Sequence, residues 1–570
     1  MNEVDVVVVG AGLAGLAAAL AAAEAGARVV VLGKGRPNAT EIVGFNVPGL
    51  APGDSPFEFL ADTIRAGDSI NDPRLVARMS EEIGVVFKDL ERRGLAMSRH
   101  GDAYHLRLAA DNRYPRIVHR DDRTGPALLS LLRRELRRLG VPIQARTTVL
   151  SLECREGCVA GLSAHDARLA AAVSYRAGAV VLAAGGAGQV YAFNTNAAGM
   201  VGQGYALALE AGAELVDMEF VQFEPFILAH PPSGRGYAVP TTVITNDGGR
   251  ITNAVGAEFL PRDRDGSFRG ITKWAMARSM FLEIRAGRGA PHGGVTLDLR
   301  HLSAEVLAGY PRLERALARA GLNPARDVLE VTPAAHHFMG GVRIDERCRT
   351  GVPGLYAAGE NAGGLHGANR MAGNSGPDGL VFGRIAGMEA AKASRESGRR
   401  PAGRMGRRQI AGRAEGRGGC ARSSANRNSS GEGHGAARRG IRRVMLAETG
   451  VARDAAGLER ARAELVEVGR ALAAAPATLE RAETLAMAMT ALAVVTAALL
   501  REESRGAHFR LDHPGSDDRR YLGSFALRLE RREGPSAAAG GGAPCDPEAL
   551  THRWLPRAPA SPTARAVAGC

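Results

Sequence analysis

The N-terminal strand, turn and helix constrain the fold more than any other part of the chain. Four valines follow Asp5, an apolar run that predicts a buried strand. A glycine-rich turn occupies residues 10–15, and an Ala/Leu-rich helix then runs to about Ala25. A second apolar run over 28–32 completes a strand–helix–strand unit. This order predicts a Rossmann-like α/β domain at the start of the chain.

The spacing of glycines in the turn predicts a dinucleotide site. Gly10 allows the tight turn, Gly12 lets a pyrophosphate approach the backbone, and Gly15 lets helix and strand pack closely. Free N–H groups and the helix dipole favour phosphate at the helix N-terminus. The candidate cofactor-binding residues are Gly10, Ala11, Gly12, Leu13, Ala14 and Gly15. Gly33 replaces the acidic residue that usually binds ribose, which disfavours NAD, and Lys34 beside it is a further candidate.

The composition of the 570 residues is that of a soluble globular protein, with 45% hydrophobic and 23% charged residues. Six cysteines are scattered without a Cys-x-x-Cys pair, so no zinc or iron–sulfur site and no metal ligand set is predicted. The charged start does not resemble a signal peptide. The longest apolar stretch, residues 485–500, is shorter than the roughly 20 residues that span a bilayer. We therefore expect a cytoplasmic protein without a direct membrane span.

The net charge of +13 does not indicate nucleic-acid binding. Residues 398–440 contain 11 Arg and 2 Glu and account for most of the excess. They lack the interleaved aromatic and basic residues of single-strand binders. The Arg/Gly/Ser composition and the lack of apolar periodicity predict a disordered linker over 398–440, and a low-complexity tail is predicted over 534–570.

A second glycine cluster lies at residues 353–384. A short strand ends in Gly359-Glu360, where Glu360 is placed to accept hydrogen bonds from a ribityl chain. Asn374 or Ser375 is expected to cap the helix that follows, with Pro377 early in it. That helix N-terminus would direct partial positive charge at a flavin. Gly359, Glu360, Asn374 and Ser375 are therefore candidate cofactor-binding residues.

Together these segments resemble the flavoprotein subunit of the succinate dehydrogenase/fumarate reductase family, with L-aspartate oxidase among its relatives. The resemblance covers most of residues 1–395 and 441–515. Supporting segments are 116–125, 183–188, 219–223, a His-x-x-x-Gly-Gly loop from His336, a His-Gly-Ala-Asn-Arg run ending at Arg370, and Glu503-Ser-Arg-Gly-Ala-His-Phe-Arg510.

The resemblance implies an FAD enzyme that acts on a carboxylate. In the family, a His of the first loop and the Arg of the second clamp a substrate carboxylate against the flavin, and His336 and Arg370 match these positions. Arg can bind a carboxylate in a bidentate manner. His336 and Arg370 are thus both catalytic and substrate-binding candidates.

Three positions depart from the family pattern. Glu224 stands where the family has a substrate-binding His, and the family's Thr-Glu pair becomes Thr241-Thr242. Alignment on Ala277-Arg278-Ser279-Met280 places Lys273 where the family has its proton-shuttle Arg. Lys can donate a proton, although it lacks the planar fork of Arg. Lys273 is therefore a catalytic candidate, and Thr241 and Glu224 are substrate-binding candidates.

The resemblance also bears on the flavin. Members with covalent FAD attach it through a His, but the matching stretch here is Asn38-Ala39-Thr40, so we expect non-covalent FAD. Gln203 replaces an acidic residue near the flavin and keeps a hydrogen-bonding group. The remaining cofactor candidates by resemblance are Thr40, Ala184, Gly185, Gly186 and Gln203.

The sequence thus predicts an α/β protein with a Rossmann-like FAD-binding domain, an inserted α+β capping domain and a C-terminal helical domain. The predicted ranges are 1–222 with 335–397, 223–334, and 441–533. The leading functional prediction is an FAD-dependent dehydrogenase or reductase that interconverts C–C and C=C bonds beside a carboxylate. The alternatives are an amino-acid oxidase like L-aspartate oxidase, and a flavin-binding protein whose substrate site has decayed. A separate iron–sulfur subunit, with attachment at the inner face of a membrane through that partner, is left open.

Overall fold

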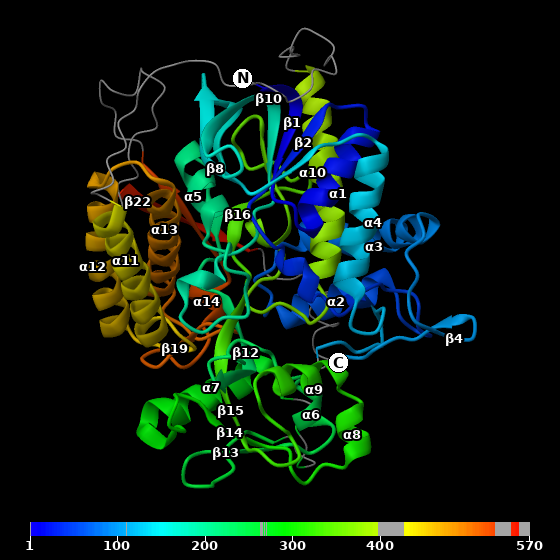
Figure 1. Cartoon of the computed structure of the whole chain (residues 1–570), viewed down its shortest axis with the longest axis vertical. Coiled ribbons are helices and arrows are strands. Elements are labelled where there is room, and N and C mark those ends of the chain that lie inside the picture. Colours follow the sequence, from blue (N-terminus) through cyan, green and yellow to red (C-terminus); the bar gives the residue numbers. More distant parts are fainter. Residues whose placement is uncertain are drawn as a thin grey trace.

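The computed structural model describes residues 2–109, 111–262, 266, 268, 271–396, 427–530 and 549–557. Its central sheet has the strand order β7-β2-β1-β10-β9-β8, with β17 paired to β10 (Figure 1). Pairing is parallel from β7 to β10 and on to β17, and antiparallel from β10 to β8. The strands are β1 (Asn2–Val9), β2 (Val29–Gly33), β7 (Ile143–Ala145), β8 (Thr147–Arg155), β9 (Cys158–Asp166), β10 (Ala171–Leu182) and β17 (Leu355–Ala357).

Helices surround this sheet and confirm the predicted strand–helix–strand opening. They are α1 (Leu13–Glu24), α2 (Pro56–Ala66), α3 (Pro73–Arg92), α4 (Thr124–Arg138), α5 (Gln203–Ala211) and α10 (Ser375–Glu396). Short pieces complete the lobe: η1 (Asn38–Glu41), β3 (Phe45–Asn46), β4 (Arg99–His100), β5 (Ala103–Tyr104) and β6 (Ile117–Val118). Pro at the first turn and a side-chain cap fix the starts of α2 and α3, through Ser55 and Asp72.

Helices α1 and α10 pack together through glycines. A Cβ atom added at Gly383 would lie 2.4 Å from the main-chain oxygen of Ala14, and one at Gly387 would lie 2.0 Å from that of Ala18. Only glycine permits such a close approach of two helix backbones. Gly379 packs against the first turn of α1, so the N-termini of the two helices lie side by side.

The inserted lobe is built on a four-stranded sheet of order β12-β15-β14-β13, seen at the bottom of Figure 1. Its elements are β12 (Val221–His230), α6 (Thr242–Thr245), β13 (Arg250–Thr252), α7 (Lys273–Glu283), β14 (Val295–Asp298), α8 (Ala304–Ala308), α9 (Pro311–Arg319) and β15 (Leu329–Phe338). The domain boundaries proposed from sequence, 222/223 and 334/335, fall inside the paired strands β12 and β15. These two strands run from one lobe into the other, so side chains on them reach the space between the lobes.

The C-terminal lobe corrects two predictions. The linker predicted over 398–440 extends too far, because residues 427–440 belong to α11 (Arg427–Glu448), which packs on α13. Residues 398–426 lie outside the described part of the chain. The tail predicted from 534 contains β22 (Leu550–Pro556), which pairs with β21 (Gly523–Leu529). Cross-strand pairs such as Phe525 with Trp554 and Leu529 with Leu550 join the two strands, and seven residues without regular alternation do not stand out beside a low-complexity stretch.

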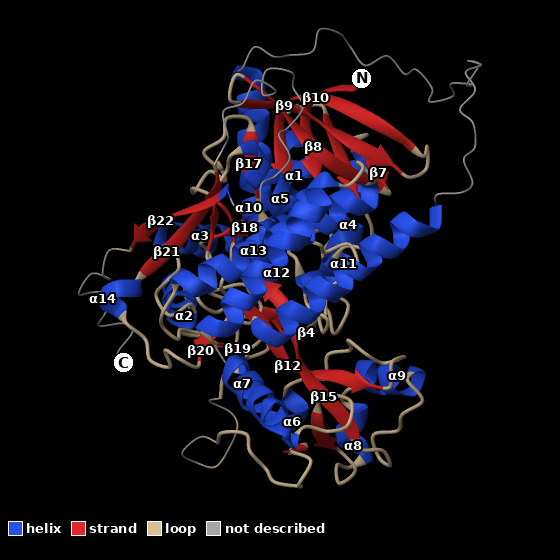
Figure 2. Ribbon diagram, turned by 90° about the vertical axis from the view of Figure 1, so that its left-hand side faces the viewer, coloured by secondary structure: helices blue, strands red, loops and turns tan. Residues whose placement is uncertain are grey.

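The remaining C-terminal helices, shown from a second side in Figure 2, are α12 (Ala455–Ala474), α13 (Leu479–Leu500) and α14 (Asp518–Tyr521). Strands β21 and β22 join three strands from earlier in the chain in a five-stranded sheet of order β18-β16-β11-β21-β22, with β11 (Leu215–Val216), β16 (Gly341–Arg343) and β18 (Ala362–Gly363). Strands β19 (Ala452–Arg453) and β20 (Phe509–Arg510) form a separate pair. Helix α13 is 22 residues long, and by length and composition it could cross a membrane. The apolar stretch noted in the sequence, residues 485–500, covers only its last 16 residues. The apolar window of α13 is 78% buried within the molecule, against α5, α11 and α12.

Candidate flavin and substrate site

The turn between β1 and α1 leaves room for a ligand at one glycine. A Cβ atom at Gly10 would lie 2.0 Å from the main-chain oxygen of Ala183, and one at Gly15 would lie 1.9 Å from that of Gly10. Gly10 also has a φ of +120°, which other residues avoid. A Cβ atom at Gly12 would meet nothing closer than 3.9 Å. Packing therefore requires glycine at 10 and 15, whereas Gly12 faces open space.

The two adjacent helix N-termini at this turn favour an anion. Helix α1 has neither a side-chain cap nor an acidic residue in its first turn. Helix α10 begins at Ser375, and Asn374 precedes it. The side chain of Asn374, one of the two predicted caps, is engaged elsewhere: its Oδ1 accepts from Asn46 Nδ2 at 2.7 Å, and its Nδ2 donates to Thr63 Oγ1 at 3.2 Å. The capping role of Ser375 stays a prediction. Helix α10 carries the buried Asp378 in its first turn, so the free main-chain N–H groups of α1 are the better site for an anion.

The second glycine cluster lies directly against the first. A Cβ atom at Gly359 would be 2.7 Å from the Cβ atom of Ala14 in α1. Glu360 follows, and its Oε1 accepts a hydrogen bond from the main-chain N–H of Phe338 at 3.1 Å. Gly186 packs on the same carboxyl, since a Cβ atom there would be 2.3 Å from Glu360 Oε1. Burial raises the pKa of Glu360 to about 7.

Two other predicted cofactor residues are engaged by the protein itself. Lys34 Nζ lies 2.6 Å from Glu483 Oε1 of α13, which ties the C-terminal lobe to the end of β2. Gln203 Nε2 donates to the main-chain oxygen of Val149 in β8. Both side chains thus have protein partners, and their contact with a cofactor stays a prediction.

The rest of the predicted cofactor set lies on loops at the ends of β2 and β10. Thr40, in η1, donates from Oγ1 to the main-chain oxygen of Pro37 at 3.0 Å. The main-chain N–H of Ala184 donates to Asn361 Oδ1 at 3.1 Å, and Asn361 Nδ2 has no partner in the described part of the chain. Gly185 has a φ of +81°. These loops follow the carboxyl ends of parallel strands, where ligands bind in such sheets.

The substrate candidates Glu224, Lys273 and Thr241 come together. Lys273 Nζ donates to both carboxylate oxygens of Glu224 at 2.8 Å, and Thr241 Oγ1 donates to Glu224 Oε1 at 3.2 Å. The Glu224 side chain is 7% exposed and that of Lys273 is 34% exposed. Burial alone would raise the pKa of Glu224, but the nearby Lys273 and the hydrogen bonds from Lys273 and Thr241 more than offset it and hold the pKa below its usual value. Lys273 is therefore no free surface lysine.

The first turn of helix α7 explains the position of Lys273. Thr272 Oγ1 accepts from the main-chain N–H of Ala275 and caps α7, so the Lys273 side chain leaves from the first turn. Helix α7 packs on β12, the strand that carries Glu224. The two residues are 49 positions apart, and only the tertiary fold pairs them.

Arg370 lies beside this group with one nitrogen unused. Its Nη2 donates to Gln222 Oε1 at 2.9 Å and its Nη1 to the main-chain oxygen of Met371 at 3.3 Å. In the described part of the chain, Arg370 Nε has no hydrogen-bond partner, although the residue is only 7% exposed. Burial lowers the pKa of Arg370 from its ordinary value, and nearby carboxyls such as Glu224 oppose this. A buried cation with a free N–H is a site for an anionic ligand.

Two adjacent histidines on β15 complete the group. His336 Nδ1 and Thr195 Oγ1 are 2.8 Å apart. Burial lowers the pKa of His336 to about 4, Glu224 opposes this, and Arg370 and Lys273 lower it further. Burial likewise holds the pKa of His337 well below its usual value. Both imidazoles are neutral at neutral pH, so they contribute hydrogen bonds and no charge.

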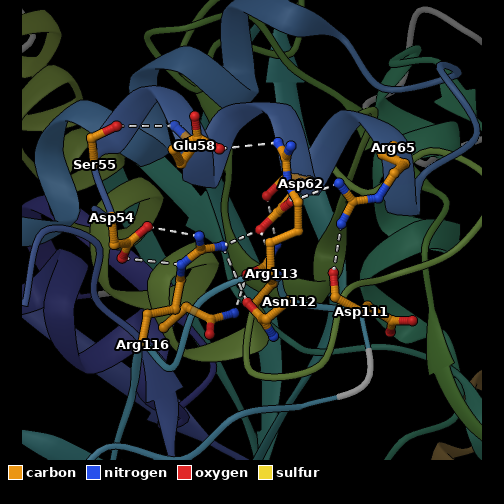
Figure 3. A network of polar contacts seen from close by, with 12 residues as sticks. Asp54, Ser55, Glu58, Asp62, Arg65, Asp111, Asn112, Arg113 and Arg116 are labelled. Carbon is orange, nitrogen blue, oxygen red and sulfur yellow. Dashed lines mark hydrogen bonds and ion pairs between the residues drawn. The ribbon is translucent and has the colours of Figure 1, made fainter. Parts of the chain in front are cut away.

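A charged network, which the sequence did not reveal, holds the loop at 111–116. Arg116 donates to Asp54 Oδ1 and Asp62 Oδ2 at 2.7 and 2.8 Å, with all three side chains fully buried (Figure 3). Arg113 Nε donates to Asp62 Oδ1 at 2.7 Å. Buried, mutually satisfied charges rigidify a structure. The network therefore fixes the loop against α2.

This loop brings Asp111 to the substrate group. Arg65 Nη2 donates to the main-chain oxygen of Asp111 at 3.2 Å, and Figure 3 shows the Asp111 carboxylate turned away from that contact. Burial raises the pKa of Asp111, and Lys273 and Arg370 oppose the rise, so the carboxyl lies within electrostatic reach of both cations. No periodic or motif signal marks position 111, because only the fold brings it beside residue 370.

A separate cavity of about 220 Å³ contains none of the predicted site residues. It lies near β16, β18 and β22. Two of its arginines are already paired with carboxylates, Arg74 with Asp72 at 2.8 Å and Arg343 with Glu214 at 3.1 Å. The chemistry of the cavity is weaker than that of the group around Arg370, which has an unused buried donor.

Comparison with known proteins agrees with this geometry. A family model described as an FAD binding domain matches residues 5–375, and one described as the fumarate reductase flavoprotein C-terminal region matches residues 438–537. The chain is 35% identical over 541 residues to one subunit of the fumarate reductase (CoM/CoB) of Methanothermobacter marburgensis, a match that covers 90% of this chain and 95% of that protein. It is 33% identical over 520 residues to L-aspartate oxidase of Agrobacterium fabrum, covering 90% and 91%.

Solved structures give the same result. Mycobacterium smegmatis Sdh1 in complex with UQ1 has a TM-score of 0.82 and 28% identity, covering 98% of this chain and 96% of that one. A structure of E. coli quinol fumarate reductase has a TM-score of 0.81 and 26% identity, covering 98% and 97%. Both likenesses extend over nearly the whole length of each chain, so they include all three lobes.

Proposed function

The chain belongs to the succinate dehydrogenase/fumarate reductase flavoprotein family, and from this premise we propose that it interconverts a C–C and a C=C bond next to a substrate carboxylate. The predicted family, fold class, enzyme class and FAD cofactor are confirmed: the protein is an FAD-dependent oxidoreductase that acts on carboxylate substrates. The bond that reacts and the role of each residue are the proposal. The observation that carries it is the buried, unpartnered Nε of Arg370 beside the Glu224–Lys273 pair.

The residues present fit FAD. The open face at Gly12 admits a pyrophosphate, and the uncapped start of α1 provides N–H donors for it. Glu360, whose pKa of about 7 keeps much of it protonated at neutral pH, and the unpartnered Asn361 Nδ2 offer further hydrogen bonds to the cofactor. FAD, when bound, supplies the hydride chemistry that no side chain can perform. Because Ala39 offers no linking nucleophile, we propose that FAD is bound without a covalent bond.

In this proposal Arg370 and His336 hold the substrate carboxylate. The Arg370 guanidinium is fixed by Gln222 and the Met371 carbonyl, which leaves Nε directed at the ligand. Neutral His336, oriented by Thr195, adds a hydrogen bond without a second charge. Holding the carboxylate in a fixed orientation reduces the entropy that is lost when the bound substrate reaches the transition state.

Lys273 is proposed to exchange the proton at that carbon. Two of its three N–H bonds are used by Glu224, which leaves one for the substrate. Glu224 holds the Lys273 side chain in place, and Thr241 in turn donates a hydrogen bond to Glu224. After Lys273 has given its proton to the substrate, a proton from solvent must restore the ammonium, and the Glu224 carboxylate is placed to relay it.

An amino-acid oxidase remains the second candidate, since L-aspartate oxidase of Agrobacterium fabrum resembles this chain over 90% of its length. Oxidation of an amine needs a neutral amino group near a proton acceptor, and the Glu224 carboxylate is the observation that favours it. The paired state of Glu224 argues against a free base. The response of the flavin to added substrates separates both enzymes from a flavin-binding protein whose substrate site has decayed.

We also propose an iron–sulfur protein as the electron partner, cytoplasmic or at the inner face of a membrane. In the part of the chain that the structure describes, no group of three or more His, Cys, Asp and Glu residues could hold a metal ion. The test of this partner is co-purification of an iron-containing protein with the native flavoprotein.

The function is tested by anaerobic reduction of the purified yellow protein followed by mixing with α,β-unsaturated carboxylates. Substrate-dependent reoxidation of the flavin, with the saturated acid as product, is expected. Hydrogen peroxide formed from an amino acid under air would favour the oxidase instead. A flavin that responds to neither class would contradict both proposals.

A further inference from the structure

We propose that the substrate carries one carboxylate and an uncharged polar acceptor, such as an amide carbonyl, at its other end, rather than two carboxylates. This inference rests on the proposed function, because it concerns the same site. It follows from the distribution of charge between the two ends of the residue group around Arg370.

One end of the group offers an uncompensated cation. Arg370 takes its two protein contacts from uncharged oxygens, the Gln222 amide and the Met371 carbonyl. Its Nε is buried and has no partner in the described part of the chain. A single carboxylate would satisfy both the charge and the free donor.

The other end offers no net positive charge. Lys273 is matched by Glu224 at 2.8 Å to both oxygens, and Thr241 adds a neutral hydroxyl. Asp111 lies within reach of Lys273 and Arg370 and can only add negative charge. A second substrate carboxylate placed here would face Glu224, which is 7% exposed and therefore poorly screened.

The histidines do not change this balance. His336, with a pKa of about 4, and His337, whose pKa lies well below its usual value, are both neutral at neutral pH. The group therefore holds two cations, Arg370 and Lys273, against the carboxylate of Glu224. One substrate carboxylate matches the remaining positive charge, whereas a second would add an excess of negative charge beside Glu224 and Asp111 in a desolvated space.

The donors at this end suit a neutral acceptor. A carbonyl oxygen can lie beside the Lys273 ammonium without adding a negative charge next to Glu224, while the third N–H of Lys273 stays available for the reacting carbon. A carbonyl conjugated to the reacting C=C bond would be polarised by the Lys273 ammonium. Such a substrate is a 2-enoate whose far end is an amide, ester or ketone.

Fumaramate and fumarate test this inference because they have nearly the same shape and differ by one charge. The reduced holoenzyme is mixed anaerobically with each compound, and kcat/KM is obtained from flavin reoxidation. We expect fumaramate to be preferred over fumarate by on the order of 10-fold or more. Preference for fumarate in the wild-type enzyme would overturn the inference.

Glu224→Gln provides the decisive variant, because it removes the negative charge and retains the shape. The fumarate/fumaramate ratio of kcat/KM is expected to rise on the order of 10-fold or more, whatever happens to the absolute rates. Glu330→Gln is the matched control, since Glu330 is on the same strand as His336 but pairs with His292 at 2.7 Å far from Arg370. An unchanged ratio in Glu224→Gln, or an equal rise in Glu330→Gln, would refute the role of charge.

A binding measurement separates this inference from the proposed function. Succinamate and succinate are titrated into the oxidised holoenzyme, and the change in flavin absorbance gives each Kd. Tighter binding of succinamate supports the inference even if no unsaturated acid reoxidises the flavin, an outcome that would overturn only the proposed reaction. Tighter binding of succinate would overturn the inference even in an active enzyme.

Discussion

Replacement of Lys273 by Met tests the proton donor and separates chemistry from stability. In the folded protein Lys273 Nζ donates to both oxygens of Glu224 at 2.8 Å, so its loss leaves that carboxyl with Thr241 as its remaining side-chain donor, at 3.2 Å. General acid catalysis contributes typically 10²–10⁴-fold. We therefore expect kcat for flavin reoxidation by an unsaturated carboxylate to fall by about 10²-fold or more, with FAD content retained.

The same replacement has a calculable effect on stability. Lys273 is 34% exposed, which weakens the ion pair through solvent screening, so we expect a loss of about 1–3 kcal/mol. In the wild type the lowered pKa of Glu224 stabilises the protein above the carboxyl's unfolded pKa, and this contribution is lost as pH falls through the folded pKa. Without Lys273, burial raises the pKa, so the variant should instead lose stability as pH rises above the unfolded value. Denaturant unfolding at mildly acidic and mildly alkaline pH measures both slopes.

The double variant Lys273→Met/Glu224→Gln is the control that shows whether the loss of rate comes from the missing proton donor or from the unpaired Glu224 carboxylate. It removes the unpaired carboxylate, so its stability should recover and its pH slope should flatten. If Lys273 is the acid, the double variant stays as slow as Lys273→Met. Recovery of the rate together with stability would show that Lys273 acts only as a partner of Glu224, and full activity in Lys273→Met alone would refute the assignment outright.

Four further outcomes are expected. Acid precipitation should release all FAD into the supernatant, because Ala39 offers no attachment point, and flavin in the pellet would contradict this. Gly12→Ala should fold with reduced FAD content. Gly15→Ala should fail to fold, because its Cβ atom would lie 1.9 Å from a main-chain oxygen. Normal FAD content in Gly12→Ala would argue against the pyrophosphate position. Arg370→Ala should lower kcat/KM by about 100-fold or more with FAD retained, and unchanged kcat/KM would remove Arg370 from the site. FAD-free protein should lose about 3 kcal/mol of stability as pH rises from about 5 to 8, because Glu360, with a folded pKa of about 7, holds a proton that the unfolded chain has released. This pH dependence should vanish in Glu360→Gln. If the variant keeps it, another group is responsible.

The local features of the fold could be predicted because each depends on residues close in sequence. The valines before Gly10 and the glycine spacing after them specify a strand, a turn and a helix without reference to the rest of the chain. Proline at the first turn likewise marks the starts of α2 and α3. Thr272 also marks the start of α7, because its side chain caps the helix that begins at Lys273.

The features that could not be predicted depend on partners far apart in the chain. Strand β22 is stabilised by pairing with β21, but the sequence on either side of it is of low complexity. The composition of this region therefore led to the wrong prediction that residues 549–557 belong to a disordered tail. Helix α11 contains Arg, Gly and Ser at positions where packing on α12 and α13, rather than intrinsic propensity, decides the structure. Asp111 reaches the site because Arg113 and Arg116 anchor its loop to Asp62. Both arginines lie more than 50 positions after Asp62 in the chain.

The Glu224–Lys273 pair shows why two departures from a family pattern have to be interpreted together. Taken singly, Glu224 removes a candidate ligand of a carboxylate, and Lys273 exchanges a planar cation for a flexible one. In the folded protein each substitution makes the other tolerable, because a buried carboxylate needs a cation and a partly buried ammonium needs a fixed acceptor. The pair is electrically neutral, and it leaves Arg370 as the cation in the group that no carboxylate contacts directly. The two changes together therefore alter how much negative charge on a substrate the site can neutralise. They do not remove its ability to bind a substrate.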